Sequence, residues 1–288
     1  MSEICKNWTE WLKKNRFAGQ TPEMIEQTTK WLEAVRDVIL LYAEIQPYET
    51  VIDIGCGTGL LAFKALELQE CKGNVIFSDM FQDCLDDCKK ILDETGVTSG
   101  YELLKCPVEH ISLPMGTVHK ALMRSVLVHV VNKQPAISEI YRILKPGGRF
   151  CAFEPIIRSN TRYWEILDPA FIDNYDDFKR AENEIMDNPL DSLCNFDDKT
   201  IKTNLEIAGF SVPEVKVQEV KSNYVVQPNM VHEWFVNPPS PTQPCVQDRF
   251  LKYFDFPTVE KFMLQVEEYL TGRTISLNTN AIFINAIK

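Results

Sequence analysis

The stretch that most constrains this chain is an apolar segment leading into three glycines at alternate positions, Val-Ile-Asp-Ile-Gly-Cys-Gly-Thr-Gly at residues 51–59. A helix-forming segment, residues 60–66, follows at once. The pattern predicts a buried strand, a tight turn and a helix, in that order. Because glycine has no side chain, such a turn lets a ligand approach the backbone closely at the carboxyl end of the strand.

Strands and helices are expected to alternate after this turn. Further strands are predicted at 75–78, 101–105, 119–126 and 149–153, with 127–130 continuing from the fourth strand, and helices at 81–94 and 135–144. The Lys-Pro-Gly-Gly segment at 145–148 predicts a sharp stop between the second of these helices and the fifth strand. Strands near 215–220 and at 281–288 bring the number to seven. We therefore predict an α/β fold with a Rossmann-like, doubly wound, mostly parallel seven-stranded sheet and an antiparallel C-terminal strand.

The segments outside this alternation define the predicted domains. Residues 1–45 predict two helices, which form either a lid over a ligand or a layer packed on the sheet. Residues 46–288 form the main domain. It carries helical insertions at about 155–200 and 225–275, which we expect to build a cap.

Composition limits the partners of this chain. The formal net charge is −11 and the isoelectric point is about 5.0, which argues against broad nucleic-acid binding. No apolar stretch approaches the roughly 20 residues of a membrane span, and the polar start lacks a signal-peptide pattern. The nine cysteines lack metal-ligand spacing. We expect a cytoplasmic protein with free thiols, no metal site and no membrane partner; the oligomeric state is left open.

An acidic residue follows the second predicted strand. Asp79 lies twenty residues beyond Gly59, the length of one strand–helix–strand half-unit, so its carboxylate is expected beside the glycine turn. There it can accept hydrogen bonds from both hydroxyls of a ribose. Alternatively, Asp79 caps the helix that begins near Phe81. The turn differs from a dinucleotide-binding GxGxxG pattern because its third glycine comes one residue early.

Together, the Asp-x-Gly-x-Gly-x-Gly loop, Asp79 and the Leu-Lys-Pro-Gly-Gly segment at 144–148 resemble the class I S-adenosylmethionine-dependent methyltransferase family. The resemblance covers about 50–154 and extends to 200–220. It implies S-adenosyl-L-methionine as the cofactor and a set of residues that contact it: Asp53, Gly55, Cys56, Gly57, Thr58, Gly59, Asp79, Met80, Val108, Glu109 and Arg124. Asp53 is expected to organise the loop amides and the ammonium group of the cofactor. The segment 107–109 stands where the family contacts adenine, although the usual aspartate is absent there.

The resemblance also implies a catalytic region after the fourth strand. Residues 124–130 resemble the segment that borders the methionine and acceptor sites in small-molecule members of the family. His129 is the best candidate for a general base or a substrate-orienting residue, with a structural histidine as the alternative. Glu154, at the end of the fifth strand, either binds the acceptor, caps a helix or pairs with Arg158. Alignment of nucleophile, methyl group and sulfur would be the main catalytic device.

The aromatic residues of the two insertions bear on the acceptor. They either wall an acceptor pocket or form only the core of the cap: Tyr163, Trp164, Phe171, Trp234 and Phe235. With the acidic charge, they favour a small organic acceptor, for which Tyr163 and Trp164 are candidate contacts. Two other functions stay open at this point. One is a Rossmann oxidoreductase that uses NAD, and the other is a non-catalytic scaffold that binds S-adenosylmethionine.

Overall fold

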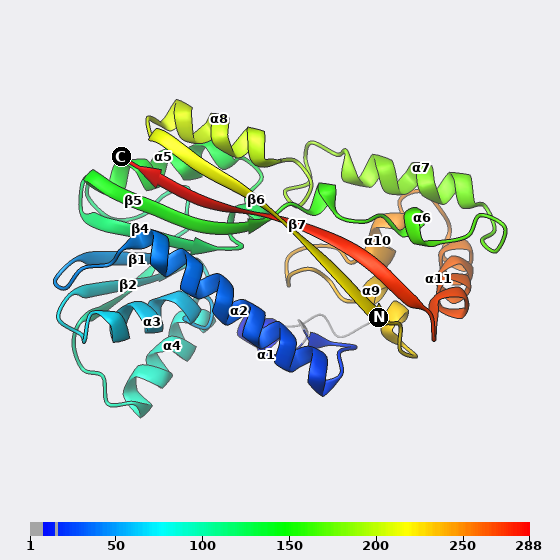
Figure 1. Cartoon of the computed structure of the whole chain (residues 1–288), viewed down its shortest axis with the longest axis horizontal. Coiled ribbons are helices and arrows are strands. Elements are labelled where there is room, and N and C mark those ends of the chain that lie inside the picture. The colour runs from blue at the N-terminus through cyan, green and yellow to red at the C-terminus, as the bar shows by residue number, and fades with distance from the viewer. Residues whose placement is uncertain (1–7, 15–16) are drawn as a thin grey trace. The chain divides into compact units, whose positions relative to one another are not determined.

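The computed structural model describes residues 8–14 and 17–288 (Figure 1). The chain divides into two compact units. The first, called the sheet unit here, comprises residues 28–156, 196–218 and 281–288. The second, called the helical unit, comprises residues 1–27, 157–195 and 219–280. Residues 1–7 and 15–16 of the predicted N-terminal segment lie outside the described residues.

The seven-stranded sheet confirms the predicted fold class. Its strands are β1 (Thr50–Ile54), β2 (Asn74–Asp79), β3 (Tyr101–Lys105), β4 (Val118–Arg124), β5 (Leu144–Pro155), β6 (Ser211–Val225) and β7 (Thr274–Ile287). They lie in the order β3-β2-β1-β4-β5-β7-β6. The pairs among β1–β5 are parallel, and β7 is antiparallel to β5. The order reverses between β1 and β4, which is where doubly wound sheets bind their ligands.

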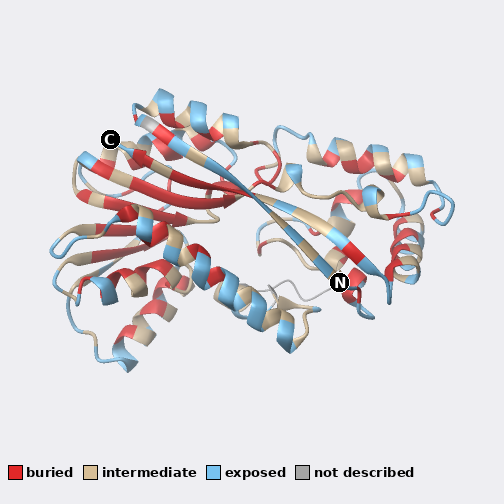
Figure 2. Ribbon diagram, viewed as in Figure 1, coloured by how far each residue is buried: buried red, intermediate tan, exposed pale blue. Residues whose placement is uncertain are grey.

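Helices cover both faces of the sheet. One face carries α2 (Pro22–Ala43), α3 (Leu60–Leu68) and α4 (Gln82–Glu94), and the other carries α5 (Lys133–Ile143) and α8 (Asp198–Ala208) (Figure 1). Residues 22–27 of α2 belong to the helical unit. Leu85, Cys88 and Leu92 recur at helical spacing and therefore share one apolar face of α4. This face is buried. Figure 2 shows the result: β1 and β4 are buried along most of their length.

The helical unit has an aromatic core of its own. Its elements are α1 (Trp8–Lys13), the 3₁₀ helix Ile157–Ser159, α6 (Tyr163–Ile166), α7 (Tyr175–Met186), α9 (Met230–Val236), α10 (Val246–Phe250) and α11 (Phe256–Leu270). Phe178 of α7 stacks on Phe262 of α11, with ring centroids 3.7 Å apart. The segments 155–200 and 225–275 thus contain helices, as expected. That they form a cap, and that residues 1–45 form a lid, stay predictions.

The structure differs from the sequence prediction in four segments. Leu127–Val130 does not continue from the fourth strand, because Ser125 has a φ of +55° and Leu127–His129 forms a 3₁₀ helix. The 145–148 segment is not a stop between elements. It lies within β5, where the pairing with β4 shifts register. Strand β7 begins at Thr274 rather than near 281; the sequence did not predict this start, because only Ile275 and Leu277 are apolar among residues 274–280. Strand β6 is likewise longer than the predicted 215–220.

Candidate cofactor site

The glycine turn follows β1 within the sheet unit. Gly55, Gly57 and Gly59 have φ angles of +65°, +53° and +82°, which disfavour any residue with a side chain. Space is also limited: a Cβ on Gly55 would stand 2.4 Å from Cγ2 of Val126, and one on Gly59 would stand 2.4 Å from Cε2 of Phe63. Backbone conformation therefore favours glycine at all three positions, and close packing adds to this requirement at Gly55 and Gly59.

Asp53 lies beneath this turn, at 2% exposure. Its Oδ2 accepts a hydrogen bond of 3.0 Å from the backbone N–H of Ala62, in the first turn of α3, where helix N–H groups lack intrahelical partners. Burial raises the pKa of Asp53 to about 8; the nearby Asp79 adds to this effect and Arg124 opposes it. In the structure, Asp53 thus binds an amide of α3. The contact of Asp53 with the ammonium group of the cofactor stays a prediction.

Asp79 joins the end of β2 to the glycine turn. Its Oδ2 accepts from the N–H of Gly57 at 2.9 Å, and its Oδ1 accepts from the N–H of Phe81 at 3.0 Å. Burial raises the pKa of the carboxyl, and the backbone N–H groups of Phe81, Gly57 and Met80 oppose the shift. The capping contact with Phe81 was the alternative interpretation of the sequence. The bond to Gly57 shows that Asp79 also lies beside the glycine turn, as the spacing predicted. Met80, next to it, is 54% exposed.

The segment after β3 reaches the same end of the sheet. The N–H of Cys106 donates to the carbonyl of Asp79 at 3.0 Å, which ties 106–109 to the end of β2. Val108 is buried and Glu109 is exposed. Both residues predicted to border adenine thus belong to a segment anchored at Asp79.

The turn after β4 is held by a buried carboxylate. Glu154, at the end of β5, is 0% exposed. Its Oε1 accepts from the N–H of Val126 (2.8 Å) and of Leu127 (3.0 Å), and its Oε2 accepts from the N–H of Val128 (3.1 Å). Of the interpretations weighed from the sequence, the structure shows the capping one. Arg158, the alternative partner, pairs with Asp187 instead. An acceptor contact of Glu154 stays a prediction.

His129 ends the 3₁₀ helix of this turn. Burial lowers the pKa of its imidazole to about 4, and the positive charge of Lys133 adds to the shift. The ring is therefore neutral near pH 7 and carries a nitrogen lone pair. Arg124, the last residue of β4, has a guanidinium whose pKa is lowered by burial; Glu154 and Asp53 oppose that shift.

Tyr163 and Trp164 lie in the helical unit. The ring of Tyr163 packs on Phe235 at 5.0 Å between centroids, and the Trp164 ring lies under the Nζ of Lys179 at 4.3 Å. Both line a small pocket that also contains Glu182, a buried carboxyl whose pKa burial raises to about 7. Tyr163 packs against the apolar core of this unit, as the alternative interpretation held. Acceptor binding by either residue stays a prediction.

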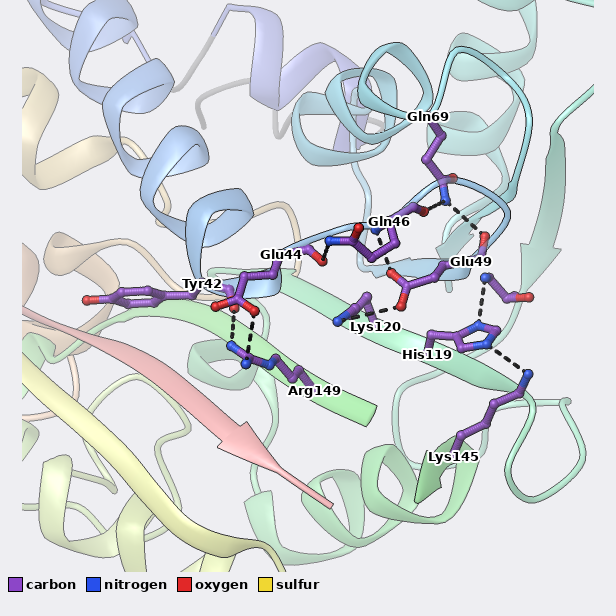
Figure 3. A network of polar contacts seen from close by, with 10 residues as sticks. Tyr42, Glu44, Gln46, Glu49, Gln69, His119, Lys120, Lys145 and Arg149 are labelled. Carbon is purple, nitrogen blue, oxygen red and sulfur yellow. Dashed lines mark hydrogen bonds and ion pairs between the residues drawn. The ribbon is translucent and has the colours of Figure 1, made fainter. Parts of the chain in front are cut away.

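A second polar cluster lies at the amino ends of the strands (Figure 3). Nδ1 of His119 accepts from the N–H of Thr50 at 2.9 Å, and Nζ of Lys120 lies 3.7 Å from a carboxylate oxygen of Glu49. Since these residues lie at the starts of β1 and β4, the cluster lies at the amino ends of the strands, and the glycine turn lies at their carboxyl ends. It joins the strands and contributes nothing to the cofactor site. Among residues 8–14 and 17–288, no group of three His, Cys, Asp or Glu side chains could hold a metal ion.

One structural feature of the site was missed by sequence reasoning. For Glu154 the sequence offered an acceptor contact, a helix cap or a pair with Arg158, but it did not identify the segment involved, which the structure shows to be three successive amides of the turn after β4. A usable signal was present: an acidic residue at the end of a strand predicted to lie beside the fourth strand, whose following turn needed acceptors for its N–H groups.

Comparison with known proteins identifies the family. Residues 45–194 match the family model described as "Methyltransferase domain". The chain belongs to this family. It is thus a member of the class I S-adenosylmethionine-dependent methyltransferases, as the motifs indicated, and S-adenosyl-L-methionine is its cofactor. The alternative of an NAD-dependent oxidoreductase is not favoured.

Two curated relatives and two solved structures illustrate the similarity. The ubiquinone/menaquinone biosynthesis C-methyltransferase UbiE of Escherichia coli O1:K1 is 27% identical over 173 residues, which cover 56% of this chain and 66% of the relative. UbiE of Vibrio cholerae serotype O1 is 24% identical over 176 residues, covering 57% and 65%. The match therefore spans just under two thirds of either relative.

Among solved structures, the YcgJ protein of Bacillus subtilis has a TM-score of 0.55 at 18% identity, covering 88% of this chain and 98% of that one. Phosphoethanolamine N-methyltransferase 2 of Haemonchus contortus, in complex with S-adenosyl-L-methionine, has a TM-score of 0.53 at 13% identity, covering 99% and 60%. At these identities the likeness shows a shared fold. Among the described residues, no helix combines the length and the apolar character needed to cross a membrane.

Proposed function

We propose that this protein transfers a methyl group from S-adenosylmethionine to a small organic acceptor. The observation that carries the proposal is the position of Asp79, whose two carboxylate oxygens bind the N–H of Gly57 and of Phe81. A carboxylate has about four lone-pair sites, more than these amides use. Hydrogen-bond acceptor capacity therefore remains beside the glycine turn, which suits the hydroxyls of a ribose.

The surrounding residues fit the rest of the cofactor. We assign the backbone of the glycine turn, with Cys56 and Thr58, to the ribose and the methionine part, since the glycines leave the backbone open to close approach. The exposed side chain of Met80 and the segment at Val108 and Glu109 would border adenine. Arg124 and Asp53 would support the methionine part, with Asp53 near its ammonium group.

The chemistry needs alignment more than acid–base strength. When bound, the cofactor supplies an electrophilic methyl group on a positively charged sulfur. The residues of this chain hold the reactants in line and exclude water, and holding two reactants in line can lower a barrier substantially. Because burial lowers the pKa of His129 to about 4, its imidazole is neutral but only weakly basic near pH 7, which favours a substrate-orienting role over that of a general base.

Two observations support the proposed class of methyl acceptor. The UbiE relatives are named as C-methyltransferases of quinone biosynthesis, so an activated carbon is the first acceptor chemistry to test. The net charge of −11 disfavours a nucleic-acid substrate. We include Tyr163 and Trp164 as candidate acceptor contacts. A cytoplasmic location remains a prediction from composition.

Binding and turnover test the proposal in sequence. We expect isothermal titration calorimetry to show binding of S-adenosylmethionine and of S-adenosylhomocysteine, with no binding of NAD. Transfer of a radiolabelled methyl group would then be measured with panels of quinols and phenols, amines, and carboxylic acids. Binding of NAD in place of S-adenosylmethionine would contradict the cofactor assignment. Binding of S-adenosylmethionine with no transfer to any member of the panels would favour a non-catalytic scaffold.

A further inference from the structure

The turn between β4 and α5 is positioned by a single side chain from the neighbouring strand. Glu154 is fully buried, yet its carboxylate accepts from three successive backbone N–H groups, at residues 126, 127 and 128. Burying a carboxylate is costly unless hydrogen bonds compensate, and N–H groups pointing at one anion are the usual compensation at a helix start. The position of this turn therefore depends on the charge of one residue.

The same turn touches the glycine loop directly. Cγ2 of Val126 lies 2.4 Å from the point where a Cβ on Gly55 would stand, so the Val126 side chain packs against the backbone of Gly55 where only glycine leaves room. Ser125, just before Val126, has a φ of +55° and donates its N–H to the carbonyl of Phe153 at 2.8 Å. A serine in the left-handed region persists only when its surroundings hold it there. The bonds made by β5 provide that restraint.

We propose that Glu154 is a positioning residue for the cofactor: it fixes the 125–129 turn against the glycine loop and so sets the affinity for S-adenosylmethionine. The proposal rests on the proposed function, because it concerns the site assigned there. It gives Glu154 a role through the backbone and requires no contact with the acceptor. His129, at the end of the same turn, is placed by the same three hydrogen bonds.

The charge of Glu154 provides a specific readout. Burial raises the pKa of its carboxyl to about 7, opposed by the three amides and by Lys133 of α5. From β4, the guanidinium of Arg124 faces both Glu154 and Asp53. A protonated carboxyl carries an O–H in place of one acceptor site, so it cannot satisfy three N–H groups equally well. The turn is therefore held most firmly above pH 7 and less firmly as the pH falls below it.

The test compares Glu154→Gln with the wild type by calorimetry with S-adenosylmethionine at pH 5.5 to 8.5. Glutamine has the size of the protonated side chain and cannot ionise. Losing charge-assisted hydrogen bonds should weaken binding about tenfold at pH 8.5. The ratio of the two affinities should then approach one at pH 5.5, where the wild-type carboxyl is itself protonated. Asp53 and Asp79 titrate in both proteins, so they cancel in this ratio.

A matched control is Glu139→Gln, in α5 of the same unit. Glu139 also accepts from a backbone N–H, that of Ile111 at 2.8 Å, and pairs with Arg142, but neither belongs to the turn. The affinities of Glu139→Gln and of the wild type for S-adenosylmethionine should have a ratio near one at every pH. A Glu154→Gln ratio that stays near one, or that is the same at pH 5.5 and 8.5, overturns the positioning role. A wild type that binds no S-adenosylmethionine contradicts the proposed function instead.

A second variant covers the case in which Glu154→Gln does not fold, as judged by thermal unfolding without ligand. Val126→Ala leaves Glu154 in place and removes the methyl groups that contact Gly55. We expect S-adenosylmethionine to bind several-fold more weakly to this variant. Unchanged affinity would show that the turn does not act on the glycine loop, and would overturn the proposal by itself.

Discussion

Replacement of Asp79 by alanine separates the fold of the sheet unit from its affinity for the cofactor. The carboxylate binds two backbone amides and is assigned to two ribose hydroxyls. Hydrogen bonds to a charged group contribute about 1.5–3 kcal/mol each, so losing the two hydroxyl contacts, with water compensating in part, should cost about 3 kcal/mol. At about 1.4 kcal/mol per factor of ten, S-adenosylmethionine should bind about 100-fold more weakly.

The effect on stability should not unfold the protein. The alanine variant loses the hydrogen bonds from the N–H groups of Gly57 and Phe81, at about 1.5–3 kcal/mol each, but this cost is partly offset because the variant no longer buries a carboxylate. With total stabilities of about 5–15 kcal/mol, the variant should stay folded. Asp86→Ala is the matched control, because Asp86 is exposed on α4 and bonds only the side chain of Gln82 among the described contacts. It should bind the cofactor as the wild type does.

A double-mutant cycle then tests whether the lost binding energy comes from the ribose hydroxyls. An analogue without the ribose 2′ and 3′ hydroxyls should bind the wild type much more weakly than S-adenosylmethionine does. Against Asp79→Ala, the two ligands should bind almost equally, because the hydroxyls have lost their acceptor. If the variant binds S-adenosylmethionine within about threefold of the wild type, or weakens both ligands alike, Asp79 does not hold the ribose.

Two further substitutions test the packing of each unit, with unfolding in urea as the measurement. Gly55→Ala should destabilise by more than the roughly 1–3 kcal/mol of a strained backbone position, because its Cβ also meets Val126. Gly96→Ala, at φ +73° with nothing within 4 Å, reports the strain alone, so equal losses in the two variants would refute the packing argument. In the helical unit, Arg249→Met should cost about 3 kcal/mol, since it leaves the partly buried Asp191 without its ion-pair partner. Lys261→Met breaks the exposed pair with Asp173 and should cost less than about 1 kcal/mol; similar losses for both would show that burial of the pair is unimportant.

The sequence predicted those parts of the fold that local patterns determine. The glycine turn and the alternation of strands and helices follow from apolar periodicity and from glycine positions, and both were confirmed. The position of Asp79 beside Gly57 followed from the length of one strand–helix–strand unit. The family resemblance then supplied the cofactor, which no periodicity could have identified.

The missed features depend on contacts between segments distant in sequence. Nothing in residues 125–129 alone shows that the chain leaves β4 through a left-handed serine, because that conformation is imposed by Phe153 and Glu154 of another strand. The sequence did not predict the start of β7 for a similar reason. Residues 274–280 are mostly polar, and the ladder rather than their composition makes them a strand.

Three buried carboxyls stand at the carboxyl ends of the strands around the proposed site: Asp53 on β1, Asp79 on β2 and Glu154 on β5. Each is directed at backbone N–H groups, those of Ala62, of Gly57 and Phe81, and of residues 126–128. Burial raises the pKa of all three, which means that the fold bears a cost to keep them there. A fold accepts such a cost where the position of a backbone segment matters for function. These bonds fix the three backbone segments at the carboxyl ends of their strands. We therefore infer that buried carboxyls position the backbone that the cofactor meets.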